Sequence, residues 1–551
     1  MTTPTAVTAL DELLAAHARE RPDAAALVLP SPGRSWLEPW LGDRVTHEVT
    51  FGALERRVGH VAAGLRSAGI GPGTRVALLV PPSDEFFVVA YALMRVRAVP
   101  VVVDPGIGLR RVGSCLGQVA PEVVIGTTQA HLARRALRWC PGARLALGVG
   151  AVPAPGTTPL RRLERTGRHL GPAGPVERPA GSPAAIVFTS GSTGPPKGVE
   201  HDDAGLLAQA GLVRDLYGLA PGDVSLATFP PFALFGPALG MTTVVPRMDP
   251  TRPARVVPAR LVRAARRTGA TVMFGSPAVL DRLGRGAPAG TSLHRLRRII
   301  SAGAPIPRDV QRRVLALLGP GAQVHTPYGA TEALPVTSIG SDELLELPDD
   351  GICVGRPVAG VDVTLIRVVD GPVRALTPDL AVPAGEVGEV VVRGPVVSRR
   401  YADRPDATAA ATLDWDGAPA HRMGDLAAYD AAGRLWYAGR VAHTVPTADG
   451  PLHSVPCEEV VNRHPAVRRS ALVGVGTGPV REPVIVVELV ARARMTDSLR
   501  AALRAHAATD PRTASITTVL AHPGLPVDPR HNSKIDRDAL ARWATTRLGV
   551  R

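Results

Sequence analysis

Residues 184–198 read AAIVFTSGSTGPPKG, an apolar run followed by a loop of Ser, Thr and Gly that Lys197 closes. The apolar run, Ala184 to Phe188, predicts a buried strand. Gly191 and Gly194 permit positive φ and a close backbone approach. Backbone N–H groups and hydroxyls in such a loop form a nest for an anion, to which a lysine adds a point charge. A Gly/Ser-rich linker is the alternative, but the strand before the loop favours phosphate binding.

The use of lysine singles out two positions. Lys and Arg total 63, yet only Lys197 and Lys534 are lysines. A planar guanidinium does not easily replace a compact ammonium, so we expect lysine to persist where the ammonium is needed. The Lys197 loop is not a Walker A loop, because Gly198 stands where that motif requires Ser or Thr.

Length and composition predict a globular protein of two or more domains. The chain has 551 residues, 45% hydrophobic and 20% charged. The formal charge of +14 comes from Arg scattered along the chain. No RNA- or DNA-binding signature accompanies it, so we expect no nucleic-acid partner. A basic surface would also steer small anionic ligands towards the protein.

Cysteines and apolar segments predict neither a disulfide scaffold, nor a zinc site, nor a membrane protein. The four cysteines are widely spaced, with no CxxC pair. The N-terminus has no basic stretch before an apolar run, so no signal peptide is expected. Arg95 and Arg97 interrupt the most apolar segment, Phe86 to Val103, so no transmembrane segment is expected. The expected location is cytoplasmic.

Strand and helix signals alternate in the first part of the chain. Residues Arg75 to Val80 predict a strand, and Ser83 is expected to cap the helix that follows. That helix is predicted from Phe86 to Val96, and a second strand from Pro100 to Val103. This βαβ unit and later alternations predict an α/β fold with largely parallel sheets. Residues 141–180, rich in Gly, Pro and Arg, are expected to form a surface excursion.

The loop resembles the phosphate motif of the adenylate-forming superfamily, which includes acyl-CoA ligases, luciferases and peptide-synthetase adenylation domains. Its pattern T-S-G-S-T-G-x-P-K-G is matched from Thr189 to Gly198. The resemblance implies a large N-terminal AMP-binding domain of stacked, mostly parallel sheets with helices, and a small mobile α+β C-terminal lid. We expect these at residues 1–438 and 439–551. The implied nucleotide-binding residues here are Thr189, Ser190, Gly191, Ser192, Thr193, Gly194 and Lys197.

Two further motifs follow in the superfamily's order. The turn from Ser301 to Pro305 resembles the adenine-contacting turn, and Tyr328 to Glu332 matches YGxTE. By this resemblance Tyr328 stacks on adenine, Thr331 bonds the α-phosphate and Glu332 holds Mg²⁺, a hard cation that takes oxygen ligands. The implied nucleotide-binding residues are Gly303, Ala304, Pro305, Tyr328, Gly329, Ala330 and Thr331, with ATP and Mg²⁺ as cofactors.

The C-terminal motifs complete the resemblance, which covers nearly the whole chain. Asp425 would bind both ribose hydroxyls, and Gly439-Arg440 would mark the inter-domain hinge, with Arg440 near the nucleotide. Residues 532–537 resemble the C-terminal lysine block, in which Lys534 would stabilise charge developing between the carboxylate and the α-phosphate. Thr189, Glu332 and Lys534 are therefore the implied catalytic residues.

The hinge block departs from the thioester-forming members. Val441 to Pro446 has no acidic or lysine hinge residue, which argues against CoA as the acceptor. Four other stretches resemble the β-lactone synthetases of long-chain olefin biosynthesis. They are Asp104 to Gly108, Ala330 to Val336, Val455 to Glu458 with Asn462 and His464-Pro465, and Pro526 to Asn532. This implies adenylation of a 2-alkyl-3-hydroxy fatty acid, whose β-hydroxyl then displaces AMP. A fatty acyl-CoA ligase or fatty acyl-AMP ligase is the alternative.

The segment Phe229 to Gly240 lies where the superfamily has its acyl pocket, with Phe232, Ala233, Phe235 and Gly236 as the implied lining. Its small residues either leave room for a branched lipid or allow close helix packing, and the sequence leaves both open. The group that accepts the hydroxyl proton is not assigned, since His201 and His325, although near motifs, suit structural hydrogen bonds.

A function without catalysis is the alternative to an enzyme. A catalytically inactive AMP-binding scaffold is one, but the intact Lys197, Glu332, Asp425 and Lys534 argue against it. The resemblance implies a β-hydroxy acid as the lipid substrate. It also implies a thiolase-like condensing enzyme, a reductase and a lactone decarboxylase as pathway neighbours, and a pathway that ends at the lactone as a natural product is the alternative.

Overall fold

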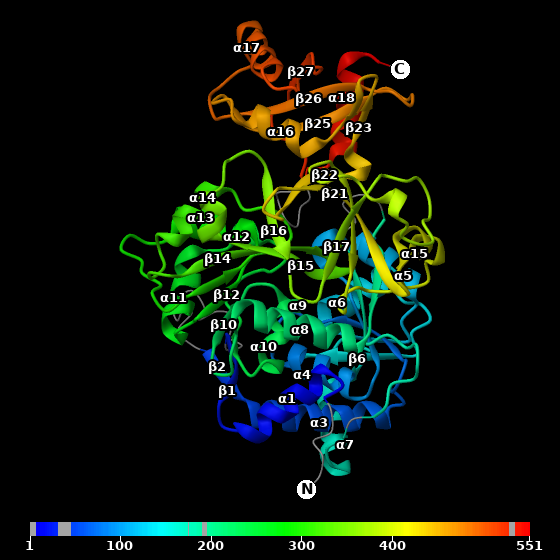
Figure 1. The fold of residues 1–551 in the computed structure, drawn as a ribbon. Helices are drawn as coiled ribbons and strands as arrows, with labels where there is room; N and C mark the ends of the chain where they lie inside the picture. Colours follow the sequence, from blue (N-terminus) through cyan, green and yellow to red (C-terminus); the bar gives the residue numbers. More distant parts are fainter. Residues whose placement is uncertain (1–6, 31–45, 175, 190–194, 528–534, 551) are drawn as a thin grey trace. The chain divides into compact units, whose positions relative to one another are not determined.

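The computed structural model describes residues 7–30, 46–174, 176–189, 195–527 and 535–550 (Figure 1). Contacts between residues divide the chain into two compact units. The larger, called the first unit, comprises residues 1–335, 358–361 and 394–409, and the second unit comprises residues 336–357, 362–393 and 410–551. The predicted boundary between residues 438 and 439 stays a prediction.

Two mostly parallel sheets build the first unit (Figure 1). In one, the described strands run β19-β9-β8-β4-β3-β5-β6-β7, parallel except at the pairs β8–β9 and β9–β19. Its strands are β3 (Arg75–Leu79), β4 (Val99–Val102), β5 (Val123–Thr127), β6 (Leu145–Val149), β7 (Thr158–Pro159), β8 (Ala185–Phe188), β9 (Gly198–His201) and β19 (Arg400–Tyr401).

The other sheet of the first unit runs β14-β13-β12-β10-β11-β1-β2. Only the last pair, β1 with β2, is antiparallel among the pairings that the described residues record here. Its strands are β1 (Ala25–Pro30), β2 (Thr46–Thr50), β10 (Val224–Ala227), β11 (Thr242–Val244), β12 (Val272–Phe274), β13 (Arg298–Ile300) and β14 (Gln323–Ala330).

Helices pack on both sheets and create the cores. The largest core combines α1, α3, α4, α7 and α8 with strands of both sheets, and α4 is buried along most of its length. A second core lies between α11, α12, α13 and the sheet that holds β12, and a third lies under α5. The described α-helices that lie wholly in the first unit are α1 (Leu10–Glu20), α3 (Phe51–Ser67), α4 (Asp84–Arg95), α5 (Leu109–Val119), α6 (Thr128–Ala136), α7 (Leu160–Leu170), α8 (Asp203–Tyr217), α9 (Pro230–Ala233), α10 (Phe235–Ala238), α11 (Pro258–Thr268), α12 (Pro277–Gly286) and α13 (Arg308–Leu315).

The predicted βαβ unit is confirmed. It consists of β3, α4 and β4, and β3 pairs with β4 in parallel. The Ser83 hydroxyl caps α4 by accepting a hydrogen bond from the Phe86 N–H at 3.3 Å. Asp84 and Glu85 occupy the first turn, where acidic side chains oppose the positive end of the helix dipole.

The expectation that residues 141–180 form a surface excursion is wrong for much of that segment. It supplies two strands, β6 and β7, and the helix α7. Helix α7 lies directly against α3 because glycines remove side chains at the crossing. A Cβ on Gly167 would lie 1.8 Å from the carbonyl oxygen of His60, and one on Gly64 would lie 2.1 Å from that of Leu163. Glycines, which suggested a loop, permit close helix packing instead.

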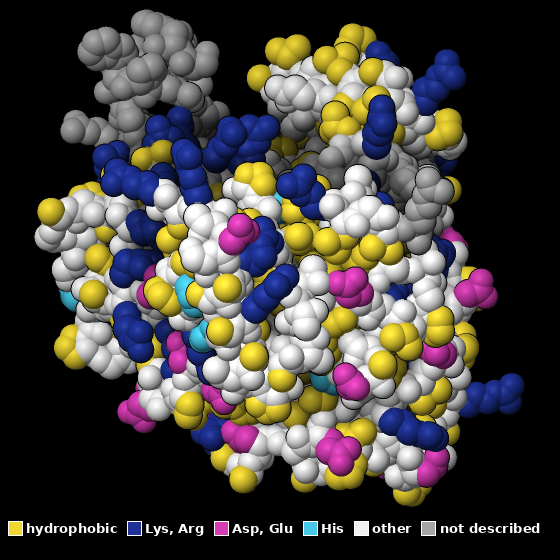
Figure 2. Space-filling view, turned by 90° about the horizontal axis from the view of Figure 1, so that it is seen from above, with side chains coloured by type: hydrophobic (Ala, Val, Ile, Leu, Met, Phe, Trp, Pro, Cys, Tyr) yellow, Lys and Arg dark blue, Asp and Glu magenta, His cyan; other side chains and the backbone are white. Residues whose placement is uncertain are grey.

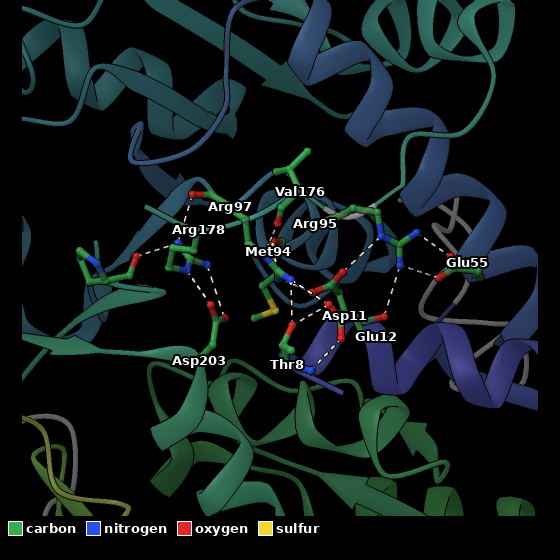
Figure 3. A network of polar contacts seen from close by, with 11 residues as sticks. Thr8, Asp11, Glu12, Glu55, Met94, Arg95, Arg97, Val176, Arg178 and Asp203 are labelled. Carbon is green, nitrogen blue, oxygen red and sulfur yellow. Dashed lines mark hydrogen bonds and ion pairs between the residues drawn. The ribbon is translucent and has the colours of Figure 1, made fainter. Parts of the chain in front are cut away.

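A buried network of charges ties α1 to the end of α4 (Figure 3). The Asp11 carboxylate is fully buried and contacts Arg95 at 3.3 Å and Arg97 at 3.0 Å. Glu55 of α3 pairs with Arg95, and Glu12 pairs with Arg97 at 2.9 Å. The two arginines that interrupt the most apolar segment of the sequence are therefore satisfied inside the protein.

The second unit is mainly antiparallel. Its first sheet runs β17-β18-β21-β22-β16-β15, and β20 pairs with β21. A hairpin of β23 and β24 follows, then a three-stranded sheet β25-β26-β27. The elements are β15 (Ala333–Gly340), α14 (Ser341–Glu346), β16 (Ile352–Pro357), β17 (Asp362–Ile366), β18 (Gly388–Arg393), α15 (Pro405–Ala411), β20 (Thr412–Trp415), β21 (Ala418–Tyr429), β22 (Leu435–Arg440), β23 (Val445–Thr447), β24 (Gly450–Leu452), α16 (Ser454–Asn462), β25 (Val467–Val475), β26 (Glu482–Leu489), α17 (Asp497–Ala508), β27 (Thr518–Ala521) and α18 (Arg537–Leu548), of which α15 and β15 span both units.

The predicted α/β class, with a large sheet-rich part and a smaller C-terminal part, is confirmed. Among the described residues, no helix is both long and apolar enough to cross a membrane. Lys and Arg side chains lie on several parts of the face that Figure 2 shows, interspersed with acidic and hydrophobic side chains.

Candidate functional site

The predicted phosphate loop connects two antiparallel strands. Strand β8 pairs with β9, with Phe188 opposite Gly198. At the base of the loop the Thr189 N–H donates to the Lys197 carbonyl at 3.0 Å, and the Lys197 N–H donates to the Thr189 hydroxyl at 3.2 Å. The remaining predicted loop residues, Ser190, Gly191, Ser192, Thr193 and Gly194, lie outside the described residues.

Three side chains from distant parts of the chain meet beside this loop. The Lys197 Nζ lies 4.7 Å from the centroid of the Tyr401 ring. The Tyr401 hydroxyl donates a hydrogen bond of 2.6 Å to the Glu332 carboxylate. The Glu332 carbonyl accepts from the Ser398 N–H at 2.7 Å, which fixes the backbone of the predicted metal ligand. The predicted phosphate lysine and metal carboxylate are therefore linked through one tyrosine.

The predicted adenine-binding residues follow neighbouring parallel strands. Strand β13 pairs with β14, and the Ser301 N–H, just after β13, donates to the His325 carbonyl of β14 at 3.0 Å. The turn with Gly303, Ala304 and Pro305 follows β13, while Tyr328, Gly329 and Ala330 end β14 and Thr331 follows. Ligands of parallel α/β sheets bind outside the carboxyl ends of the strands, where both motifs lie.

Two local features suit a bound base. Gly303 has φ +98°, and a Cβ on Gly329 would lie 2.4 Å from the Ala333 carbonyl oxygen, so both backbones require glycine. The Ser301 hydroxyl is fully buried and, among the described residues, has no hydrogen-bond partner. An unsatisfied buried hydroxyl is costly, so a partner such as an ordered water or a ligand group is expected here.

The two histidines near the motifs are held by packing. His201 ends β9 and is buried, which lowers its pKa to about 4 although the nearby Glu332 carboxylate opposes the shift. It is therefore neutral at physiological pH. The His325 ring lies 5.0 Å from the Tyr217 ring. Both positions are compatible with the structural role that the sequence suggests.

In the second unit, Asp425 and Arg440 face each other across an antiparallel pair. They are opposite in the register of β21 and β22, and the Arg440 Nε lies 3.1 Å from the Asp425 Oδ1. The Asp425 residue is 3% exposed, and the Tyr437 hydroxyl lies 3.5 Å from the same oxygen. The predicted ribose carboxylate is thus held by a charged hydrogen bond.

The segment that follows the predicted hinge, Val441 to Pro446, carries no charge at neutral pH. Gly439 has φ +120°, and a Cβ there would lie 2.4 Å from the Ser454 hydroxyl oxygen. Burial, with the positive charges of Arg537 and Arg440, lowers the pKa of His443 to about 4. The segment Val441 to Pro446 therefore presents neither an anion nor a cation.

The predicted catalytic Lys534 lies outside the described residues, but both ends of its segment are fixed. Val527 and Ile535 form an antiparallel bridge. Arg537, at the start of α18, donates to both carboxylate oxygens of Glu458 at 2.7 Å each. Glu458 also accepts from the Leu472 N–H, and its burial raises its pKa. A buried ion pair thus anchors the chain three residues after Lys534.

A small apolar cavity lies in the first unit, beside the adenine-site strands. About 270 Å³ at this site, open solvent included, is not filled by atoms. Phe232, one of the four predicted acyl-pocket residues, lines it and stacks on Phe274 at 4.1 Å between centroids. The other lining residues are Val213, Tyr217, Ile300, Pro327, Leu334 and Pro335.

The small residues of Phe229 to Gly240 serve packing at two positions. A Cβ on Gly236 would lie 1.9 Å from the Thr243 hydroxyl oxygen, and one on Gly240 would lie 2.9 Å from the His17 ring. Ala233 is 2% exposed and belongs to the main core, and the Phe235 ring packs edge-to-face on Phe232. The assignment of Ala233, Phe235 and Gly236 to an acyl pocket stays a prediction.

The sequence analysis missed Tyr401 and most of the cavity lining. Tyr401 is one of only six tyrosines, and this rarity is the signal that could have drawn attention to it. The lining residues Tyr217, Phe274 and Leu334 come from separate elements and share no motif.

The sequence of this chain is similar to those of known AMP-binding enzymes. A family model described as "AMP-binding enzyme" matches residues 14–402. The chain is 44% identical over 546 residues to an olefin β-lactone synthetase of Stenotrophomonas maltophilia, covering 97% of each chain. It is also 44% identical over 542 residues to one of Xanthomonas campestris pv. campestris, covering 96% of each.

Solved structures show the same fold. The amide bond synthetase McbA of Marinactinospora thermotolerans superposes with a TM-score of 0.76 at 23% identity, covering 97% of this chain and 99% of that one. ATP-bound MatB of Rhodopseudomonas palustris gives 0.75 at 21% identity, covering 97% and 99%. The matched family model, the full-length relatives and the shared fold lead to one conclusion: the chain belongs to the AMP-binding enzyme family.

Proposed function

We propose that this protein is an ATP-dependent β-lactone synthetase that adenylates a 2-alkyl-3-hydroxy fatty acid and closes the lactone on the adenylate. The observation that carries the proposal is 44% identity, over 97% of the chain, to an olefin β-lactone synthetase. The uncharged segment Val441 to Pro446 supports it, because thioester-forming relatives are expected to carry an acidic or lysine hinge residue there.

The proposed nucleotide-binding groups come from several motifs along the chain. Thr189 and Lys197 bind phosphate, Tyr328 stacks on adenine and Thr331 bonds the α-phosphate. Asp425 accepts the ribose hydroxyls, with Arg440 beside it. The buried Ser301 hydroxyl and the glycine backbones at 303 and 329 support the adenine assignment.

The residues present fit Mg²⁺ with one protein carboxylate. Among the described residues, no three His, Cys, Asp or Glu side chains are grouped as a metal site. Mg²⁺ commonly binds through one or two carboxylates together with substrate phosphates and water. Glu332 would be that carboxylate, and the bound cation would neutralise phosphate charge.

In the first proposed step a carboxylate oxygen of the fatty acid attacks the α-phosphorus of ATP. The bond from the α-phosphorus to the bridging oxygen breaks, and pyrophosphate leaves. Lys534 stabilises the charge that develops on the attacking carboxylate and the α-phosphate. Thr189 and Lys197 hold the departing phosphates.

In the second proposed step the substrate's β-hydroxyl oxygen bonds to the acyl carbon, and its proton ends on the departing AMP phosphate. The bond from the acyl carbon to the phosphate oxygen breaks, and AMP leaves with a four-membered lactone formed. Because the hydroxyl belongs to the same molecule, proximity can offset roughly 7–11 kcal/mol of the barrier. The protein contributes by holding both groups close while excluding water.

The apolar cavity around Phe232 is the proposed entrance of the acyl chain. The free space at this site is small even with open solvent included, so we expect the cavity to widen when a long acyl chain binds. A thiolase-like condensing enzyme and a reductase would supply the β-hydroxy acid, and a lactone decarboxylase would consume the product.

The decisive experiment supplies ATP, Mg²⁺ and a 2-alkyl-3-hydroxy fatty acid without CoA. We expect AMP, pyrophosphate and a β-lactone, identified by NMR on unheated samples. A strict requirement for CoA, with a thioester as product, would show a CoA ligase instead.

A matched substrate separates the two steps. The same 2-alkyl acid without its 3-hydroxyl should support exchange of labelled pyrophosphate into ATP, yet give no lactone. If neither acid supports exchange, adenylation itself is refuted.

A further inference from the structure

Tyr401 joins the two charged groups that the proposed function places on the phosphates and the metal. Its hydroxyl donates to the Glu332 Oε1 at 2.6 Å, and its ring face lies 4.7 Å from the Lys197 Nζ. A cation over an aromatic ring is attracted to the ring's negative face. One side chain thus contacts an anion through its edge and a cation through its face.

The backbone around Tyr401 is fixed on both sides. Strand β19 pairs with β9, with Tyr401 opposite Val199, and the Tyr401 N–H donates to the Thr408 hydroxyl at 3.0 Å. The next residue, Ala402, donates to the Gly198 carbonyl at 2.7 Å and accepts from the Gln118 side chain at 2.7 Å. The position of the Tyr401 ring is therefore set by the sheet that carries Lys197.

The Tyr401 side chain is well suited to orient Glu332. The residue is only 7% exposed, so its hydroxyl bond forms largely away from water. A carboxylate has two oxygens, and a fixed donor on Oε1 determines the direction in which Oε2 points. Carboxylates that bind metals are commonly oriented in this way by a neighbouring hydrogen bond.

We propose that Tyr401 is a positioning residue: its hydroxyl orients Glu332 towards the Mg²⁺ of the nucleotide, and its ring holds the Lys197 ammonium beside the phosphate loop. The inference rests on the proposed roles of Glu332 and Lys197. It explains why a segment more than sixty residues beyond Glu332 in sequence returns to the sheet at β9.

Tyr401→Phe separates the two functions, because it removes the hydroxyl and keeps the ring. We expect Mn²⁺ binding in the presence of ATP, followed by electron paramagnetic resonance, to weaken by roughly 10-fold to 100-fold. The Mg²⁺ concentration that half-saturates ATP–pyrophosphate exchange should rise equally, while the KM for the fatty acid stays unchanged.

A double-mutant cycle tests whether Tyr401 acts through Glu332. If it does, Tyr401→Phe should add little to the loss of Mn²⁺ binding in Glu332→Gln. Tyr429→Phe is the matched control, because that hydroxyl donates to the Val363 backbone carbonyl at 3.2 Å and has no link to Glu332 in the described structure. Its Mn²⁺ binding should equal that of the wild type.

The outcomes distinguish this inference from the proposed function. Unchanged Mn²⁺ binding in Tyr401→Phe, or additive losses in the cycle, would overturn the positioning role. Mn²⁺ binding needs no fatty acid, so a weakened variant supports the role even if no acid is adenylated. Thermal unfolding monitors folding, and if Tyr401→Phe unfolds early, Tyr401→Trp, which keeps an aromatic face but lacks the hydroxyl, takes its place.

Discussion

At the scale of single residues, Asp11 shows how a buried charge depends on its partners (Figure 3). Burial raises the pKa of this carboxyl, and the neighbouring Arg95 and Arg97 counteract the shift only in part. Such a network is not evidence of net stabilisation, since taking ions out of water is costly. Removing one partner is nevertheless costly, because it leaves the others buried and unpaired.

We therefore expect Asp11→Asn to lower the free energy of unfolding by about 3–5 kcal/mol, measured by denaturant titration. Glu122→Gln is the control, since Glu122 and its partner Arg144 are about half exposed and 3.7 Å apart. It should change stability by no more than about 1 kcal/mol. Equal effects of the two substitutions would show that burial of the Asp11 network is unimportant.

At the scale of elements, the crossing of α3 and α7 depends on glycine. Gly167→Ala would place a methyl group 1.8 Å from the His60 carbonyl oxygen, so the helices must separate. We expect a loss of at least about 1–3 kcal/mol in the free energy of unfolding. Gly117→Ala, on an exposed face of α5 with no atom within 4 Å of the new Cβ, should instead stabilise by roughly 0.5–1 kcal/mol. Stabilisation by both would disprove the close contact.

Individual elements differ in how far sequence predicts them. The unit β3–α4–β4 is specified locally, because an apolar strand, a serine cap and acidic first-turn residues are adjacent in the chain. Helix α7 is not, because its sequence, with Gly167 and several arginines, resembles a loop until α3 is placed against it. The same reason makes Gly236 a packing residue, since its neighbour Thr243 belongs to β11.

At the scale of the whole molecule, the proposed chemistry needs groups from motifs spread along the chain, from Thr189 to Lys534. We expect Lys534→Ala to abolish exchange of labelled pyrophosphate into ATP while ATP binding, measured by calorimetry, persists. Arg542→Ala, on an exposed position of α18, is the control and should retain exchange. Full exchange in Lys534→Ala would refute the assigned role.

The sequence by itself determined the α/β class, the strand β8 that leads into the predicted phosphate loop, and the order of the motifs along the chain. These are local patterns, in which residue type and spacing carry the information. Only the tertiary structure decided that Tyr401 lies between Lys197 and Glu332, and that Phe232 and Phe274 line one cavity. Such neighbours come from strands far apart in the chain, and their proximity is set by sheet register and core packing, which no local pattern encodes.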